Sequence, residues 1–182
     1  MANRFIRRLV GAAMFDAATY EDVEADRAAT PQALAIILFS SLAAGIGARG
    51  SSGAAATLSF FATASVMALI TWVAFALLTF EIGARLLPSE DTRADVGELL
   101  RTLGFAATPG LIQVFGVFPG ATVPVFTLAI AWALAASVVA VRQALDYTST
   151  GRAVAVCGLG LLLSLVIALV LGLVFGPTVS GN

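Results

Sequence analysis

The 182-residue chain contains 59% hydrophobic and only 12% charged residues, and its formal net charge at pH 7 is -1. A soluble domain of this length has roughly a quarter of its residues charged, so the composition excludes a water-exposed globule and indicates a surface that faces lipid. Histidine is absent and Cys157 is the single cysteine, which excludes an intramolecular disulfide, a site of clustered thiolates and a His-dependent catalytic triad.

Residues 1–30 are expected to form a cytoplasmic segment that begins with a short amphipathic helix. One face of its helical wheel carries Phe5, Ile6, Leu9, Val10 and Ala13, and the other carries Arg4, Arg7 and Arg8. This pattern favours a helix in the plane of an anionic membrane surface, and the alternative is a frayed tail. The apolar run after Arg8 ends at Asp16, so we do not expect a signal peptide.

Five charge-poor stretches follow, at residues 31–48, 57–80, 97–120, 120–141 and 153–175. About 20 apolar residues in a helix cross the roughly 30 Å of hydrocarbon in a bilayer. The stretches therefore predict an all-α polytopic membrane protein, with a bundle of five transmembrane helices in residues 31–176. Residues 177–182 are expected to form a short external tail.

Local signals mark the helix ends. Thr30 is expected to cap the first span, with Pro31 at the first helical position, where its missing N–H costs nothing. The run Thr92-Arg93-Ala94-Asp95 predicts a capping box, so the third helix should begin in water and enter the membrane near Arg101.

Pro109 and Gly110 interrupt the third stretch. Proline removes one backbone hydrogen bond, so a kink near mid-membrane is expected, with Gln113 as the partner of the freed carbonyl group. Phe118-Pro119-Gly120 leaves only a tight turn before the next stretch, so the third and fourth spans should form an antiparallel hairpin.

Small residues recur every four positions in the last span, at Gly160, Ser164, Ala168, Gly172 and Gly176. Such a ladder lets a second helix approach closely. We expect it, together with Pro109, to serve packing inside the bundle, and homodimerisation is possible but not favoured. Trp72 and Trp132 lie within spans, which indicates bundle packing or lipid contact.

Arginine placement predicts the orientation, because cytoplasmic loops retain basic residues during insertion. A cytoplasmic N-terminus leaves only Arg49 outside and places nine arginines inside: Arg4, Arg7, Arg8, Arg27, Arg85, Arg93, Arg101, Arg142 and Arg152. The acidic residues fall on the same side. We therefore expect a multi-pass protein of a bacterial inner membrane with an external C-terminus.

The chain carries no phosphate-binding loop and no HExxH motif. Glu81 is the acidic residue nearest to a span, and an i,i+4 ion pair with Arg85 at the interface explains it without a function. We therefore expect no enzymatic activity, no metal and no cofactor.

Three cytoplasmic segments, "TYEDVEADRAATPQA", "GELLRTLGFAATPG" and "VRQALDYTSTGRA", occur beside five spans, and Gly104-Phe105 is followed by Pro109. As a set, these features resemble the bacterial branch of the Yip1 domain family from Tyr20 onward. The resemblance implies a small integral membrane protein. Eukaryotic relatives bind prenylated Rab GTPases, but this chain lacks their Asp-Leu-x-Gly-Pro motif, so Rab binding is not expected.

The leading hypothesis is a non-enzymatic membrane protein that organises or recruits partners through its cytoplasmic face. The alternatives are a small-solute permease or channel component and an accessory subunit. One partner-binding site is expected from eight residues: Tyr20, Glu21, Asp22, Glu24, Asp26, Arg101, Arg142 and Arg152. A solvated rim of mutually neutralising charges is the competing interpretation. Besides the lipid bilayer, a cytoplasmic or membrane protein is the expected partner, and no nucleic acid is expected.

The arginine distribution makes the topology testable with reporter fusions. A reporter that is active only outside the cytoplasm should be active when fused after Asn182 and silent when inserted within residues 88–91. The reverse pattern of activity would invert the proposed orientation.

Overall fold

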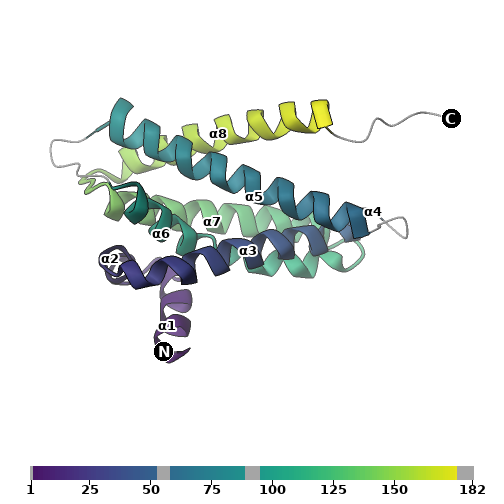
Figure 1. Cartoon of the computed structure of the whole chain (residues 1–182), viewed down its shortest axis with the longest axis horizontal. Coiled ribbons are helices and arrows are strands. Elements are labelled where there is room, and N and C mark those ends of the chain that lie inside the picture. The colour runs from purple at the N-terminus through teal and green to yellow at the C-terminus, as the bar shows by residue number, and fades with distance from the viewer. Residues whose placement is uncertain (1, 53–57, 89–94, 176–182) are drawn as a thin grey trace.

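The computed structural model describes residues 2–52, 58–88 and 95–175, and nearly all of them are helical (Figure 1). In chain order the elements are α1 (Ala2–Ala13), α2 (Ala17–Ala25), η1 (Arg27–Ala29), α3 (Thr30–Gly47), α4 (Arg49–Ser52), α5 (Leu58–Phe80), the π-helical η3 (Glu81–Leu86), α6 (Val96–Ala106), the 3₁₀ helix η4 (Thr108–Val117), α7 (Thr122–Ala144) and α8 (Thr150–Phe175). These residues include no strand, so the all-α fold is confirmed.

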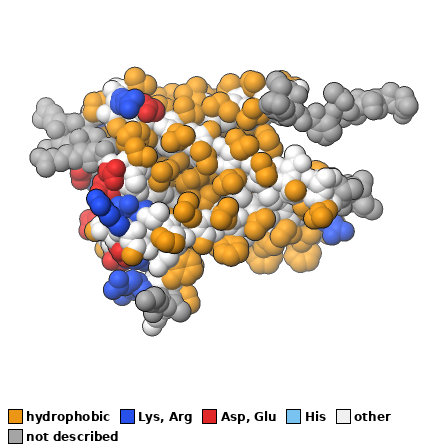
Figure 2. Space-filling view, viewed as in Figure 1, with side chains coloured by type: hydrophobic (Ala, Val, Ile, Leu, Met, Phe, Trp, Pro, Cys, Tyr) orange, Lys and Arg blue, Asp and Glu red, His pale blue; other side chains and the backbone are white. Residues whose placement is uncertain are grey.

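Within the described residues, four continuous helical stretches are long and apolar enough to cross a membrane: Arg27–Gly47, Leu58–Leu86, Thr122–Ala144 and Thr150–Leu173. They run along the long axis of the molecule (Figure 1). Many large hydrophobic side chains are exposed, and they are spread between the two ends on the face that Figure 2 shows. Such a surface is compatible with lipid rather than water, and the chain is therefore a polytopic membrane protein.

The fifth expected span consists of two shorter helices. The α-helix α6 ends at Ala106, and η4 continues as a ten-residue 3₁₀ helix. Neither segment is among the four continuous helical stretches of membrane-spanning length in the described residues. The expectation of one kinked α-helix is wrong, because the α-helical hydrogen bonding stops where Pro109 enters.

The carbonyl group freed by Pro109 belongs to Phe105, and it accepts a hydrogen bond of 2.6 Å from Thr108 Oγ1. The prediction that Gln113 fills this role is wrong. A hydroxyl group on the residue just before the proline reaches the Phe105 oxygen within the same turn, whereas Gln113 lies beyond it on η4. In the hydrocarbon this bond removes the cost of an unpaired carbonyl group.

The expected caps also need correction. Thr30 is the first residue of α3 and donates to Arg27 O at 2.9 Å, while Ala29 occupies the cap position. Pro31 does lie in the first turn, as expected. Residues 92–94 of the expected capping box lie outside the described residues, and Asp95 caps α6 through its backbone conformation without a side-chain hydrogen bond.

The small-residue ladder of α8 packs only in its first half. A Cβ atom at Gly160 would lie 2.6 Å from Thr79 Oγ1 on α5, and Ser164 is fully buried. At Gly172 an added Cβ atom would meet nothing within 4 Å. Ala168 is half-buried, and Gly176 lies outside the described residues. The expectation that Gly172 packs inside the bundle is therefore wrong, because α8 and α5 diverge toward the C-terminal end of α8 (Figure 1).

The difference between the two glycines is testable by adding the same side chain at each. Gly160→Ile should destabilise the protein by about 1–3 kcal/mol through overpacking against Thr79. Gly172→Ile should leave the melting temperature in detergent nearly unchanged. Equal loss of stability in the two variants would contradict the divergence of α5 and α8.

Candidate partner-binding site

The charged side chains gather at one end of the bundle, beside α1, α2, η3 and the start of α6 (Figure 2). We call this region, together with residues 142–152, the charged end. Arg49 lies at the opposite end, where its guanidinium carbon is 5.9 Å from the centroid of the Phe61 ring. At the charged end, the expected ion pair joins Arg85 Nη1 and Glu81 Oε2 at 2.8 Å. All eight residues of the expected partner-binding site lie at the charged end.

Arg8 of α1 is buried at the charged end, with a side chain that is 1% exposed. Its Nε donates to Asp22 Oδ2 and its Nη2 to Asp26 Oδ2, each at 2.8 Å. Further hydrogen bonds of 3.4 Å reach Asp22 O and Gln32 Oε1. A helical wheel predicts Arg8 on the lipid-headgroup face of α1, and this prediction is wrong, because the guanidinium group turns inward and joins α1 to α2 and α3.

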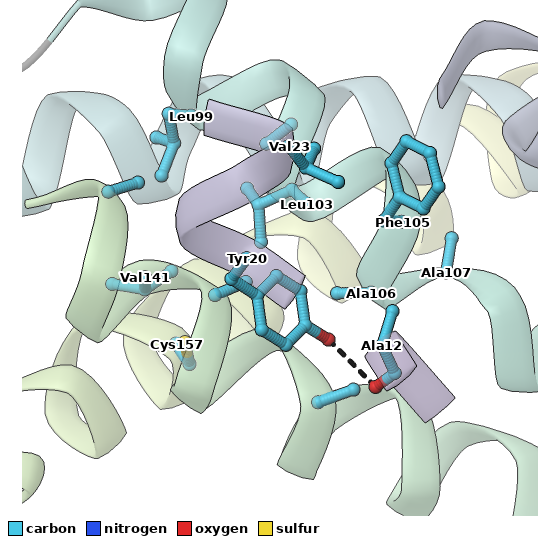
Figure 3. Close-up of a cluster of buried hydrophobic side chains, with 14 of the residues drawn as sticks. Ala12, Tyr20, Val23, Leu99, Leu103, Phe105, Ala106, Ala107, Val141 and Cys157 are labelled. Atoms are coloured by element: carbon cyan, nitrogen blue, oxygen red, sulfur yellow. Dashed lines mark hydrogen bonds between the residues drawn. The ribbon is translucent and has the colours of Figure 1, made fainter. Parts of the chain in front are cut away.

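Two further hydrogen bonds hold the C-terminal end of α1, whose last carbonyl groups have no partner within the helix. Tyr20 Oη donates to Ala12 O at 3.0 Å, as Figure 3 shows, and Trp132 Nε1 donates to Ala13 O at 2.7 Å. Trp132 therefore does more than the packing or lipid contact expected of it. With its last two carbonyl groups held in this way, α1 is a docked helix and not a frayed tail.

The apolar face of α1 divides between the bundle and the surroundings. Phe5 contacts the Phe105 ring edge-to-face at 6.4 Å between centroids. Ile6, Val10 and Met14 remain exposed, and so do Arg4 and Arg7. Figure 1 shows α1 projecting sideways from the long axis of the bundle. These features fit a helix in the membrane plane, with apolar side chains toward lipid and arginines toward headgroups.

The acidic helix α2 packs on α6 and α7 through Tyr20 and Val23, which are both fully buried (Figure 3). Its exposed edge carries Glu21, which accepts a 2.9 Å hydrogen bond from Gln143 Nε2, and Asp22, whose side chain is 46% exposed despite its contact with Arg8. The segment from Tyr20 to Asp26 is therefore a fixed structure with an acidic outer face.

Arg101 of α6 is the one expected arginine that lies against this segment. Its side chain is buried, and Nη2 donates to the backbone oxygen of Glu24 at 2.7 Å. Its Nε has no hydrogen-bond partner among the described residues. Burial, with Glu98 and Asp146 nearby, raises the pKa of Glu24 to about 7, although Arg101 opposes this shift. Hydrogen bonding to Arg8 lowers the pKa values of Asp22 and Asp26.

Arg142 and Arg152 organise the connection between α7 and α8 instead. Arg142 donates to Tyr147 O at 3.3 Å and to Thr150 Oγ1 at 3.2 Å. Arg152 donates to Pro88 O at 3.0 Å, and its guanidinium carbon lies 5.7 Å from the Tyr147 ring centroid. Among the described residues, neither forms an ion pair with a carboxylate. The structure thus brings Arg101 to the acidic segment, whereas Arg142 and Arg152 form hydrogen bonds with Tyr147, Thr150 and Pro88 instead.

Sequence reasoning missed Arg8 and Gln143, the side chains that contact the carboxylates of α2. Gln143 belongs to α7, far from α2 in the chain, and Arg8 belongs to α1, whose packing against α2 depends on the turn between the two helices. Residue spacing alone therefore predicts neither contact. Within residues 2–52, 58–88 and 95–175, no group of three His, Cys, Asp or Glu side chains could hold a metal ion. The contacts that the charged end shows are ion pairs and hydrogen bonds.

In a comparison with known families, the model of the Yip1 domain matches residues 15–171. This range contains α2 and the whole bundle up to the last turn of α8, and it begins after α1. No curated protein and no solved structure matches the chain. The Arg8 contacts therefore join a helix outside the matched range to the first helix within it.

Replacing Arg8 tests the connection between α1 and α2. Arg8→Ala leaves the carboxylates of Asp22 and Asp26 without their buried cation, so the melting temperature should fall by at least about 5 °C. Arg7→Ala, on the exposed face of the same helix, is the matched control and should change it little. A similar effect of both substitutions would show that Arg8 does not anchor α1.

Glu24 should make stability depend on pH. Folding raises its pKa from an ordinary 4.5 to about 7, so its stabilising contribution is complete below about pH 4.5 and is lost as the pH rises through about 7. When the pH is raised from about 5 to about 8, the melting temperature of the Glu24→Gln variant should fall less than that of the unsubstituted protein. Identical pH profiles for the two proteins would refute this assignment.

Proposed function

Because the chain belongs to the Yip1 domain family, we propose that this integral membrane protein is not an enzyme and recruits a protein partner through its charged end. The proposed location is a bacterial cytoplasmic membrane, with the charged end in the cytoplasm. Support for this orientation comes from the arginines, which concentrate at that end and leave Arg49 at the other. Five crossings then place the end of α8 outside.

The observation that carries this proposal is the fixed acidic face of α2. Tyr20 and Val23 anchor the helix in the core, and Arg8 holds its last turn, while Glu21 and Asp22 remain exposed. A surface that is already ordered loses little conformational entropy when it binds. Its negative charge favours a partner with a basic contact surface and would speed their encounter.

The permease alternative has less support. A transport pathway for a polar solute needs hydrogen-bonding groups directed into it at membrane depth. The cavity between the spans, of about 320 Å³, is walled mostly by apolar side chains. Its serine and threonine hydroxyl groups donate to backbone carbonyl groups, as in the 2.8 Å bond from Ser137 to Ala133 O. These donors are therefore not free for a solute.

Site-specific crosslinking tests the recruitment function. A photoreactive residue placed at exposed Ala18, on the same face of α2 as Glu21, should form a discrete protein adduct in native membranes. Glu21→Arg should abolish that adduct and leave the melting temperature almost unchanged, because an exposed charge affects recognition more than folding.

The matched control is Glu81→Arg, another exposed acidic residue at the charged end, which should preserve the adduct. Loss of the adduct in both variants would indicate a general charge effect. An adduct that survives Glu21→Arg would instead favour the solvated rim over a recruitment site.

A further inference from the structure

A partly open cavity of about 320 Å³ lies inside the bundle, between α5 and α8 on one side and α3, η4 and α7 on the other. Its walls come from the middle of these helices, which places it at the depth of the hydrocarbon. Ligand pockets range from about 300 to about 1,000 Å³, so this volume suits a segment of one chain-like molecule and not a whole lipid.

Most polar groups in the wall are already hydrogen-bonded. Ser40 donates across helices to Ala107 O at 3.0 Å, and Thr71 and Ser164 donate to carbonyl groups of their own helices at 2.8 Å. Gln113 differs, because it also lines the cavity and its side-chain amide has no hydrogen-bond partner among the described residues. The cavity thus presents apolar walls with one available amide group.

These walls fit hydrocarbon better than water. A buried water needs two to four polar partners, and the available amide supplies only one side chain for that purpose. In a bilayer, the surrounding molecules that can fill a partly open apolar cavity are lipid chains. An unpaired amide at this depth is costly, so it favours an occupant that carries a hydrogen-bonding group near one end of its chain.

The position of Gln113 orients the occupant. Gly47, near the outer end of α3, packs against the backbone of Gln113, and Arg49 follows two residues later at the end opposite the charged end. A chain that enters from this end would place its first polar group near Gln113 and a phosphate group near the exposed Arg49. A phospholipid has this order of apolar chain, ester and anionic phosphate.

We propose that the cavity binds one acyl chain of a phospholipid from the leaflet on the Arg49 side, with its ester carbonyl group accepting a hydrogen bond from Gln113 Nε2. This inference is independent of the recruitment function, because it concerns the membrane-embedded part of the bundle and no residue of α2. The lipid chain is then a bound component of the folded protein.

The first test uses phosphatidylcholine with a photoreactive group on one acyl chain, incorporated in trace amounts into vesicles that contain the purified protein. Labelling of the unsubstituted protein should map to the cavity wall of α7, between Phe126 and Ser137. Ala133→Phe fills the cavity and should reduce that labelling at least about fivefold. Ala131→Phe, which adds the same ring on the lipid-facing side of α7, should not.

The second test addresses Gln113 and remains informative if Ala133→Phe fails to fold. The unsubstituted protein should label about three- to fivefold more with the diester lipid than with its diether analogue, because one hydrogen bond is lost. Gln113→Leu should label equally with both. Equal labelling of Ala133→Phe and Ala131→Phe, or no ester preference in the unsubstituted protein, would overturn the proposal. Cavity labelling by a photoreactive fatty acid but not by the phospholipid would also overturn it.

Discussion

The arrangement of the charged end depends on the burial of one guanidinium group. A cation with a 1% exposed side chain is stable only where anions and hydrogen-bond acceptors replace water, and Arg8 obtains both from Asp22 and Asp26. These contacts fix α2 against α1, and both helices also pack on α6 and α7. The acidic face of α2 therefore owes its position to a residue that lies before the part of the chain matched by the family.

Other contacts around Arg8 make this arrangement specific. Tyr20 and Trp132 bind consecutive carbonyl groups at the end of α1, so the helix cannot slide along the bundle without breaking a buried hydrogen bond. Arg101 binds the backbone of α2 from the opposite side. The acidic helix α2 is thus held by α1, α6 and α7. A displacement of any of these three helices would therefore move the exposed edge of α2.

The sequence predicts features that depend on local composition or spacing, such as the apolar spans, the Glu81–Arg85 pair and the interruption at Pro109. Prediction from sequence fails where the position of a side chain depends on contacts with other helices. A helical wheel assigns Arg8 to the solvent face because it does not contain Asp22, and a four-residue repeat includes Gly172 although the partner helix has already diverged. In the candidate site, the acidic segment and the nearby Arg101 could be predicted from the sequence. The contact of Gln143 with Glu21 and the bond of Arg152 to Pro88 could not, because both depend on how the helices pack.

The 3₁₀ geometry of η4 also determines how the bundle closes against α3. With three residues per turn, Gly110, Gln113 and Gly116 lie one above another on the same face of η4. In an α-helix, with about 3.6 residues per turn, residues at this spacing would shift progressively around the helix. Added Cβ atoms at Gly47 and Gly50 would collide with the carbonyl oxygens of Gln113 and Gly116, and one at Gly110 would lie 3.1 Å from Ser40 Cβ. The proline break therefore produces a straight seam along which the backbone of η4 directly meets the backbones of α3 and α4, beside the ring of Phe126.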